Sequence, residues 1–248
     1  MSILYTIAPL ALGIATILRL RLWNSRPKTR ALTVTLGSLA ISITARMPFL
    51  GDDIINPAIH KLTGLANTSE IISHTFVIVG ATGLAIIGSR MAGKTSAKPF
   101  IIAGTAIALV MILVYLASDA SVVETPDLTS LGGRGVLIYW LLFSGGLGMG
   151  VIGIWYGAHE ALKDVLSRHT RIALRFLIVG SIFALLYLGY KLIYLAWDLA
   201  SIPALNESYL TISWILVGAS LVAYAISGGF EGVFRLRQKW LNRTHKKR

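Results

Sequence analysis

The 248-residue sequence contains no cysteine and carries little charge. Without thiols, the chain cannot form disulfides, cysteine-ligated metal sites or a thiolate nucleophile. Only 14% of its residues are charged, against roughly 25% in a soluble domain. Hydrophobic residues make up 55% of the chain and the mean hydropathy is +0.71. This composition excludes an ordinary soluble enzyme, a disordered chain and a disulfide-stapled secreted module, and it predicts an integral membrane protein.

The sequence contains long apolar stretches with few charged residues. A helix that crosses the hydrocarbon core needs about 20 mostly apolar residues, and we predict seven such spans at 3–20, 31–50, 70–88, 99–118, 136–158, 172–197 and 209–227. The loops between them are too short to hold a soluble domain. The first stretch has no basic residue before it, unlike a secretory signal, so we expect an uncleaved span. The predicted fold is an all-α bundle of seven transmembrane helices, with a membrane domain at 1–229 and a tail at 230–248.

The basic residues fall on one side of this arrangement. Alternate loops and the tail hold 19 of the 23 Lys and Arg residues, and the opposite loops hold 8 of the 11 acids. Cytoplasmic loops of membrane proteins are enriched in Lys and Arg. We therefore expect the N-terminus outside and the C-terminus inside, in the plasma membrane. The formal net charge of +12 is explained by this sidedness, and we predict no nucleic-acid partner.

The tail is basic and amphipathic. Five apolar residues recur at nearly helical spacing among Arg and Lys residues: Phe230, Val233, Phe234, Trp240 and Leu241. Such a segment lies in the membrane interface, where each basic residue gains about 1 kcal/mol from anionic lipids. We predict that the tail contacts the bilayer and its anionic inner-leaflet lipids. The alternative is a positively charged stop after the last span.

Two conspicuous patterns have simpler explanations. Residues 88–95 fit the phosphate-loop pattern GxxxxGK[ST], but that loop needs a preceding strand in a covered sheet. Here an apolar span precedes it, which favours a basic turn. Seven spans with an external N-terminus are also typical of retinal proteins, but the stretch 209–227 has no Lys for the cofactor, and Lys191 is one helix too early. No HExxH, catalytic triad or intramembrane carboxylate pair is present, so we predict no cofactor, no metal and no catalytic residues.

The fifth predicted span carries a stripe of small residues. Gly146, Gly150, Gly153 and Gly157 lie at i, i+4, i+7 and i+11, on one face of a helix. Glycine at such positions lets a second helix approach closely. We predict tight packing inside the bundle, with a dimer seam or a hinge as alternatives.

A few ionisable groups lie inside or at the ends of spans, where they are costly and usually face the bundle interior. We predict that groups from three helices line an outward-facing polar pocket for a small anion or a proton-coupled substrate: Arg46, Glu70, His74, Tyr187, Lys191, Tyr194 and Asp198. The alternative is that Arg46 and Lys191 reach the headgroups. Asn67 and Glu70 have the spacing of a capping box. Tyr139, Trp140 and Trp197 are expected in an interfacial aromatic belt.

Two segments resemble a known family. Residues 59–67 contain an LTG-x-x-N turn, and Arg171–Ala196 places Gly180, Tyr187 and Lys191 at matching positions of a sixth span. Within a more diffuse similarity, these segments resemble an uncharacterised actinobacterial family of seven-span membrane proteins that are labelled transporters. The resemblance implies the same membrane fold and compartment. Typical members continue into a larger cytoplasmic region, so any output function of that region is expected to be absent here.

Three functions remain open from the sequence. The first is a small-molecule or ion transporter with an outward-facing polar pocket, although no internal repeat or pair of broken helices is evident. The second is a receptor-like or accessory membrane subunit that binds an outer ligand and a protein partner, or forms a homo-oligomer. The third and weakest is a membrane-embedded enzyme, because the acidic residues lie in loops or at span ends.

Overall fold

The computed structural model describes residues 4–24, 30–94, 96–125, 127–131, 133–164, 167–199 and 208–245, and all regular structure within them is helical. The helices have these bounds: α1 Leu4–Leu20, α2 Arg30–Ala45, α3 Pro48–Leu50, η2 Gly51–Ile55, α4 Asn56–Thr63, α5 Thr68–Met91, α6 Lys98–Leu116, η3 Asp119–Ser121, η4 Leu128–Leu131, α7 Gly133–Asp164, α8 Arg168–Leu199 and α9 Ser208–His245.

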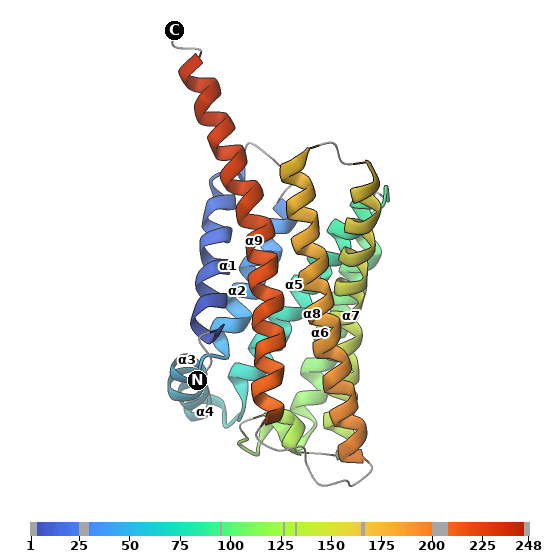
Figure 1. Cartoon of the computed structure of the whole chain (residues 1–248). Coiled ribbons are helices and arrows are strands. Elements are labelled where there is room, and N and C mark those ends of the chain that lie inside the picture. Colours follow the sequence, from blue (N-terminus) through green and yellow to red (C-terminus); the bar gives the residue numbers. More distant parts are fainter. Residues whose placement is uncertain are drawn as a thin grey trace.

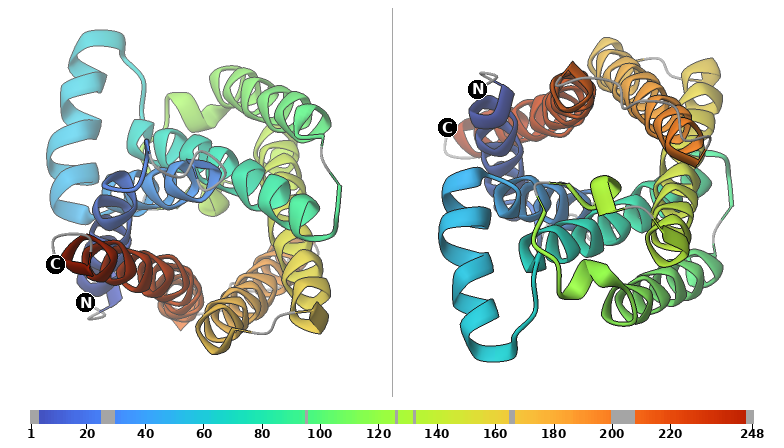
Figure 2. Two further views of the ribbon diagram at one scale, coloured as in Figure 1. Left: turned by 90° about the horizontal axis from the view of Figure 1, so that it is seen from above. Right: turned by 90° about the horizontal axis from the view of Figure 1, so that it is seen from below.

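Six of the long helices form a ring (Figures 1 and 2). Around this ring α1 packs on α2, α2 on α5, α5 on α7, α7 on α8, α8 on α9, and α9 back on α1. The seventh long helix, α6, lies outside the ring against α5 and α7. The ring therefore surrounds an interior, and this interior holds the site described below.

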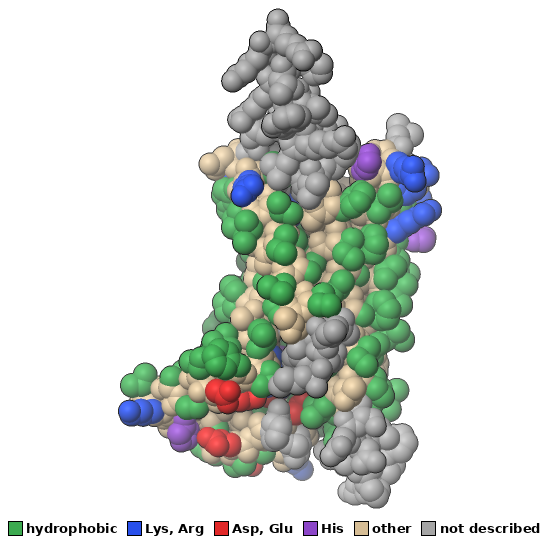
Figure 3. Space-filling view, turned by 60° about the vertical axis from the view of Figure 1, so that its left-hand side comes forward, with side chains coloured by type: hydrophobic (Ala, Val, Ile, Leu, Met, Phe, Trp, Pro, Cys, Tyr) green, Lys and Arg blue, Asp and Glu red, His purple; other side chains and the backbone are tan. Residues whose placement is uncertain are grey.

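Several helices are suited to a bilayer. Among the described residues, five helices (α5 to α9) are long and apolar enough to cross a membrane. The bent pair formed by α2 and the Pro48–Thr63 segment makes a sixth if it counts as one span, and α1 is a shorter apolar helix. The chain thus has the helices of a membrane-embedded protein. On the visible face, apolar side chains are spread between the two ends, and the charged side chains are concentrated at the ends (Figure 3).

The second predicted span, 31–50, is wrong at its C-terminal end. α2 ends at Ala45, and the chain turns by 73° into the Pro48–Thr63 segment. Met47 is extended, with φ −67° and ψ 128°, and Pro48 begins the next helix. A residue before proline is disfavoured in the α conformation by the proline ring, so the helix ends there although the apolar sequence continues. The segment projects from the ring (Figures 1 and 2) and leaves Phe49 and Leu62 exposed.

Two helices are longer than the apolar stretches suggested. α7 continues to Asp164, so His159 and Glu160, which follow the predicted span 136–158, are helical. α9 runs unbroken for 38 residues to His245, about 57 Å at 1.5 Å per residue. The backbone of the predicted tail up to His245 therefore continues this helix beyond the ring (Figure 1). The side chains after Phe230 lie outside the described part, and the tail's contact with lipid stays a prediction.

Candidate functional site: a charged cavity inside the helix ring

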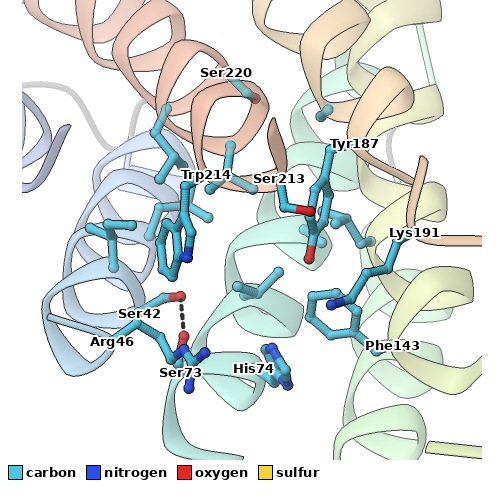
Figure 4. Close-up of a pocket in the computed structure, with 18 of the residues that line it drawn as sticks. Ser42, Arg46, Ser73, His74, Phe143, Tyr187, Lys191, Ser213, Trp214 and Ser220 are labelled. Atoms are coloured by element: carbon cyan, nitrogen blue, oxygen red, sulfur yellow. Dashed lines mark hydrogen bonds between the residues drawn. The ribbon is translucent and has the colours of Figure 1, made fainter. Parts of the chain in front are cut away.

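A cavity of about 110 Å³ lies between α2, α5, α7, α8 and α9 (Figure 4). A water molecule needs roughly 10–15 Å³ of such space, so the cavity has room for several waters or a small organic molecule. Its charged and titratable lining consists of Arg46, Glu70, His74, Asp127, Tyr187, Lys191 and Tyr224. Its apolar lining includes Leu39, Ile43, Val77, Leu84, Phe143, Leu147, Val217 and Leu221. The cavity is thus amphipathic.

One wall is built around the carboxylate of Glu70. Arg46, directly after α2, donates from Nη1 to Glu70 Oε2 at 3.1 Å. The backbone N–H of Leu128 donates to the same oxygen at 3.3 Å. The Arg46 guanidinium also lies 5.9 Å from the centre of the Trp214 ring of α9. Glu70 is 1% exposed, so a buried carboxyl group on α5 links Arg46 to the loop before α7, and Arg46 in turn contacts α9.

The opposite wall is built around Lys191 of α8. Its ammonium lies 3.3 Å from Asp127 Oδ2 and 3.4 Å from Oδ1. It also lies 4.1 Å from the centre of the Trp140 ring and 4.9 Å from that of Tyr209. Lys191 is 2% exposed. The alternative in which this lysine reaches the headgroups is therefore wrong, because its charge is balanced by a carboxylate and by two aromatic faces inside the ring.

Asp127 lies in the loop between η3 and η4, outside the long helices. Burial raises the pKa of its carboxyl, but the Lys191 ammonium, the hydrogen bonds from Thr129 and the Arg46 guanidinium together hold that pKa below its usual value. Both the hydroxyl and the backbone N–H of Thr129 donate to Asp127 Oδ1. The carboxylate is therefore charged at neutral pH and pairs with Lys191.

The loop that carries Asp127 closes one end of the ring, and Asn67 fastens it. The Asn67 side-chain amide donates to the carbonyls of Ala120, at 2.8 Å, and Val123, at 2.7 Å. Its carbonyl oxygen accepts from the backbone N–H of Thr125 at 3.0 Å. Seen from that end of the ring, the 119–131 loop crosses in front of the interior (right-hand view of Figure 2). We name this segment, which the sequence predicts to face outward, the outer loop.

The capping-box prediction for Asn67 and Glu70 is wrong. Asn67 precedes α5 with φ 53° and makes no side-chain cap, because its side chain binds the outer loop. Asn56 takes that role: its Oδ1 accepts from the Ser69 backbone N–H at 2.7 Å and from the Thr68 hydroxyl at 3.1 Å. The Glu70 carboxylate is thereby left for Arg46 and Leu128.

His74 lies in an aromatic setting one turn along α5 from Glu70. Its Nδ1 is 2.6 Å from the Tyr139 hydroxyl, and its ring centre lies 5.1 Å from Trp140 and 4.3 Å from Phe143. Tyr139 is 2% exposed and Trp140 1%. The belt prediction for these two residues is therefore wrong: they pack inward around His74 and Lys191. Trp197 has a side chain outside the described part.

Two polar features face the cavity between these walls. The hydroxyls of Ser42 and Ser73 lie 3.0 Å apart and join α2 to α5. Tyr187, on α8 one turn before Lys191, points its hydroxyl into the cavity (Figure 4). That side chain is more than nine-tenths buried, and its hydroxyl has no hydrogen-bond partner among the described residues. It is a polar group available to a molecule in the cavity.

The structure brings five of the seven predicted pocket residues onto the cavity wall: Arg46, Glu70, His74, Tyr187 and Lys191. Tyr194 does not line it and instead stacks on Tyr209 with ring centres 3.7 Å apart. The side chain of Asp198 lies outside the described part. Asp127 was not predicted as a site residue because it lies in a loop. It is 64 positions from Lys191 in the sequence, and only the fold brings the two side chains together. One sequence signal could have pointed to Asp127: a lysine inside a membrane span needs an acidic partner to balance its charge.

The glycine stripe of α7 lies against α5. A Cβ on Gly150 would come within 2.4 Å of the Ala81 carbonyl oxygen, and one on Gly157 within 2.1 Å of the Gly88 carbonyl oxygen. Gly153 faces Ala85, and Gly146 faces Ile78. Gly88, the first residue of the phosphate-loop pattern, is thus a buried helix-packing position at the end of α5. The stripe sets the α5–α7 separation and so the position of Glu70 and His74 relative to α7.

The described residues contain no group of three or more His, Asp or Glu side chains that could hold a metal ion. Comparison of the chain with known protein families, with curated proteins and with solved structures finds no match.

Proposed function

We propose that this protein is a seven-span membrane carrier that binds a small molecule in the cavity inside its helix ring. The observation that carries the proposal is that Arg46 and Lys191 enter one cavity from opposite walls (Figure 4), each held by a carboxylate. Ionisable groups inside a membrane protein are costly and mark substrate or ion pathways. A cavity with a few convergent polar groups and apolar walls is the usual form of a small-molecule site.

The proposed carrier has its N-terminus outside and its C-terminus inside, and α1 and α2 complete the seven spans. α1 has 17 residues and α2 has 16, about 24–26 Å at 1.5 Å per residue, near the lower limit for a span. In Figure 3 the acidic side chains on the visible face gather at the end with the bent α3–α4 segment, and most of the Lys and Arg side chains lie at the other end. By the positive-inside rule the acidic end, with the outer loop, faces outward.

The orientation has a direct test, since the chain has no native cysteine. Single cysteines at Lys61, in α4, and at Lys94, in the α5–α6 connection, give background-free labelling sites. A membrane-impermeant thiol reagent applied to intact cells is expected to label K61C and to label K94C only after permeabilisation. The reverse pattern would overturn the orientation.

Transport is tested with purified protein in proteoliposomes and a panel of radiolabelled anions, cations, amino acids and sugars. At least one solute is expected to show saturable uptake that Tyr187→Phe weakens and Tyr156→Phe leaves unchanged. Tyr156 is exposed on α7 and does not line the cavity, and so serves as the matched control. Absence of saturable uptake across the panel would overturn the carrier proposal.

A second candidate function is that of a receptor-like or accessory subunit. It is favoured by α9, whose backbone continues as helix to His245 beyond the ring, where a basic helix could contact a protein partner or anionic lipid. Purification from native membranes distinguishes the two functions. A stoichiometric partner that is lost on truncation after Phe230 supports the accessory role, whereas a lone protein with saturable uptake supports the carrier.

A further inference from the structure

Resting on the proposed binding function, we infer that the ligand is a small zwitterion with an apolar side chain, of the chemical type of an apolar amino acid. The inference comes from the charge balance of the cavity, from its polarity gradient and from its size.

The charge balance excludes most ligands with a net charge. The cavity holds two cations, Arg46 and Lys191, and two carboxylates, Glu70 and Asp127. Both pairs are formed, at 3.1 and 3.3 Å, so each cation of the lining has a carboxylate partner, and the four charges sum to zero when both carboxylates are ionised. An anion or a cation entering this buried space would leave one unit of charge unbalanced, which is expensive away from water. A zwitterion adds no net charge.

The same four groups can bind both ends of a zwitterion. Arg46 and Lys191 are donors for a carboxylate, and the Glu70 and Asp127 carboxylates are acceptors for an ammonium. The two ion pairs are joined through the loop, because Glu70 accepts from the backbone N–H of Leu128, the residue after Asp127. An ammonium between the two acids would therefore lie beside a carboxylate held by either cation. The Tyr187 hydroxyl, which has no partner among the described residues and points into the same space, supplies one more hydrogen bond (Figure 4).

The apolar part of the cavity lining determines which side chain the zwitterionic ligand carries. Along α2, α5, α7 and α9 the cavity wall continues as Leu39, Leu84, Leu147 and Leu221. A purely polar zwitterion would leave this wall without contact, whereas a branched aliphatic side chain would bury against it at about 25 cal/mol per Å². The volume of about 110 Å³ leaves room for a small organic molecule with a compact side chain but not for a long acyl chain.

The experiment measures binding of four probes to the full-length protein in nanodiscs by titration calorimetry. The probes are L-leucine, its anionic derivative N-acetyl-L-leucine, its cationic derivative L-leucinamide, and neutral 3-methylbutan-1-ol. L-leucine is expected to bind at least tenfold more tightly than the other three. Tyr187→Phe, which removes one hydroxyl and keeps the ring, is expected to weaken leucine binding about fivefold. Tyr156→Phe is expected to leave it unchanged.

Two outcomes would overturn the inference. If a charged or neutral probe binds as tightly as leucine and Tyr187→Phe weakens it, the cavity is a ligand site for another class, and the carrier proposal stands without the zwitterion. If no probe binds, the zwitterion inference fails, and the proteoliposome panel decides the carrier proposal separately.

Discussion

Lys191 of α8 and Asp127 of the outer loop form an ion pair 3.3 Å long inside the helix ring, although 64 positions separate them in the chain. The pair attaches the loop that closes one end of the ring to the helix that carries Tyr187. Breaking a buried pair by removing one partner leaves an uncompensated charge and costs roughly 3–5 kcal/mol. We therefore expect Lys191→Met and Asp127→Asn each to lower stability by about that amount, measured by unfolding in mixed micelles.

The double variant K191M/D127N isolates the interaction energy between Lys191 and Asp127 from the effects of each side chain on its other neighbours. Because no buried charge is left unpaired in it, its loss of stability is expected to be smaller than the sum of the two single losses by at least about 1 kcal/mol. Additive losses would contradict a direct interaction between the two side chains.

The same ion pair predicts how the stability of the folded protein depends on pH. The folded protein holds the pKa of Asp127 below its usual value, and an unfolded Asp titrates near 3.9. The stabilisation from this depressed pKa is complete above the unfolded pKa and is lost only as pH falls through the folded pKa. The stability advantage of the native protein over D127N is therefore expected not to shrink between pH 8 and pH 5. A difference that shrinks towards pH 5 would show that Asp127 is not held charged by Lys191.

The α5–α7 contact predicts opposite results for two glycines on one helix. Gly150→Ala would place a Cβ 2.4 Å from a backbone oxygen of α5, whereas a Cβ on Gly145 meets nothing within 4 Å. Overpacking a close helix contact costs typically 1–3 kcal/mol, and alanine in a helix is favoured over glycine by up to about 1 kcal/mol. G150A is expected to lower the thermal midpoint and G145A to leave it unchanged or raise it. Equal effects would contradict the packing of this face.

Asn67 is expected to control the outer loop. Asn67→Ala removes three hydrogen bonds to residues 120–125, each worth about 1 kcal/mol. The backbone amides of this loop should exchange faster with deuterium in N67A, measured by mass spectrometry. Asn67→Gly is the control for the left-handed backbone at this position, φ 53°, and should raise exchange as strongly, because the lost bonds are those of the side chain. Protection of the loop in both variants would contradict its attachment by Asn67.

The sequence predicts the fold correctly for those helices whose positions depend on hydropathy alone. The stretches 70–88 and 99–118 lie within a few residues of α5 and α6, because about 20 apolar residues leave the backbone no partner in lipid except its own helix. Hydropathy did not detect the 73° bend after α2. There the apolar run continues through Pro48, and the break depends on backbone geometry.

The cavity was predictable only in part. The cost of ionisable groups in spans pointed to Arg46 and Lys191, which do lie on one cavity. The position along a span gives depth but not the direction of a side chain, so Tyr139 and Trp140 were assigned to the membrane interface although they pack around His74. Asp127 could not be assigned, because its place beside Lys191 depends on how Asn67 holds the loop.

The central claim is that the space between Arg46, Tyr187 and Lys191 holds a small molecule. An experimental density map of the protein purified from its native membrane tests this claim most directly. The account predicts compact non-protein density within hydrogen-bonding distance of the Tyr187 hydroxyl and beside the two ion pairs. Side chains that fill the space, or a lipid chain that enters it between the helices, would contradict the account.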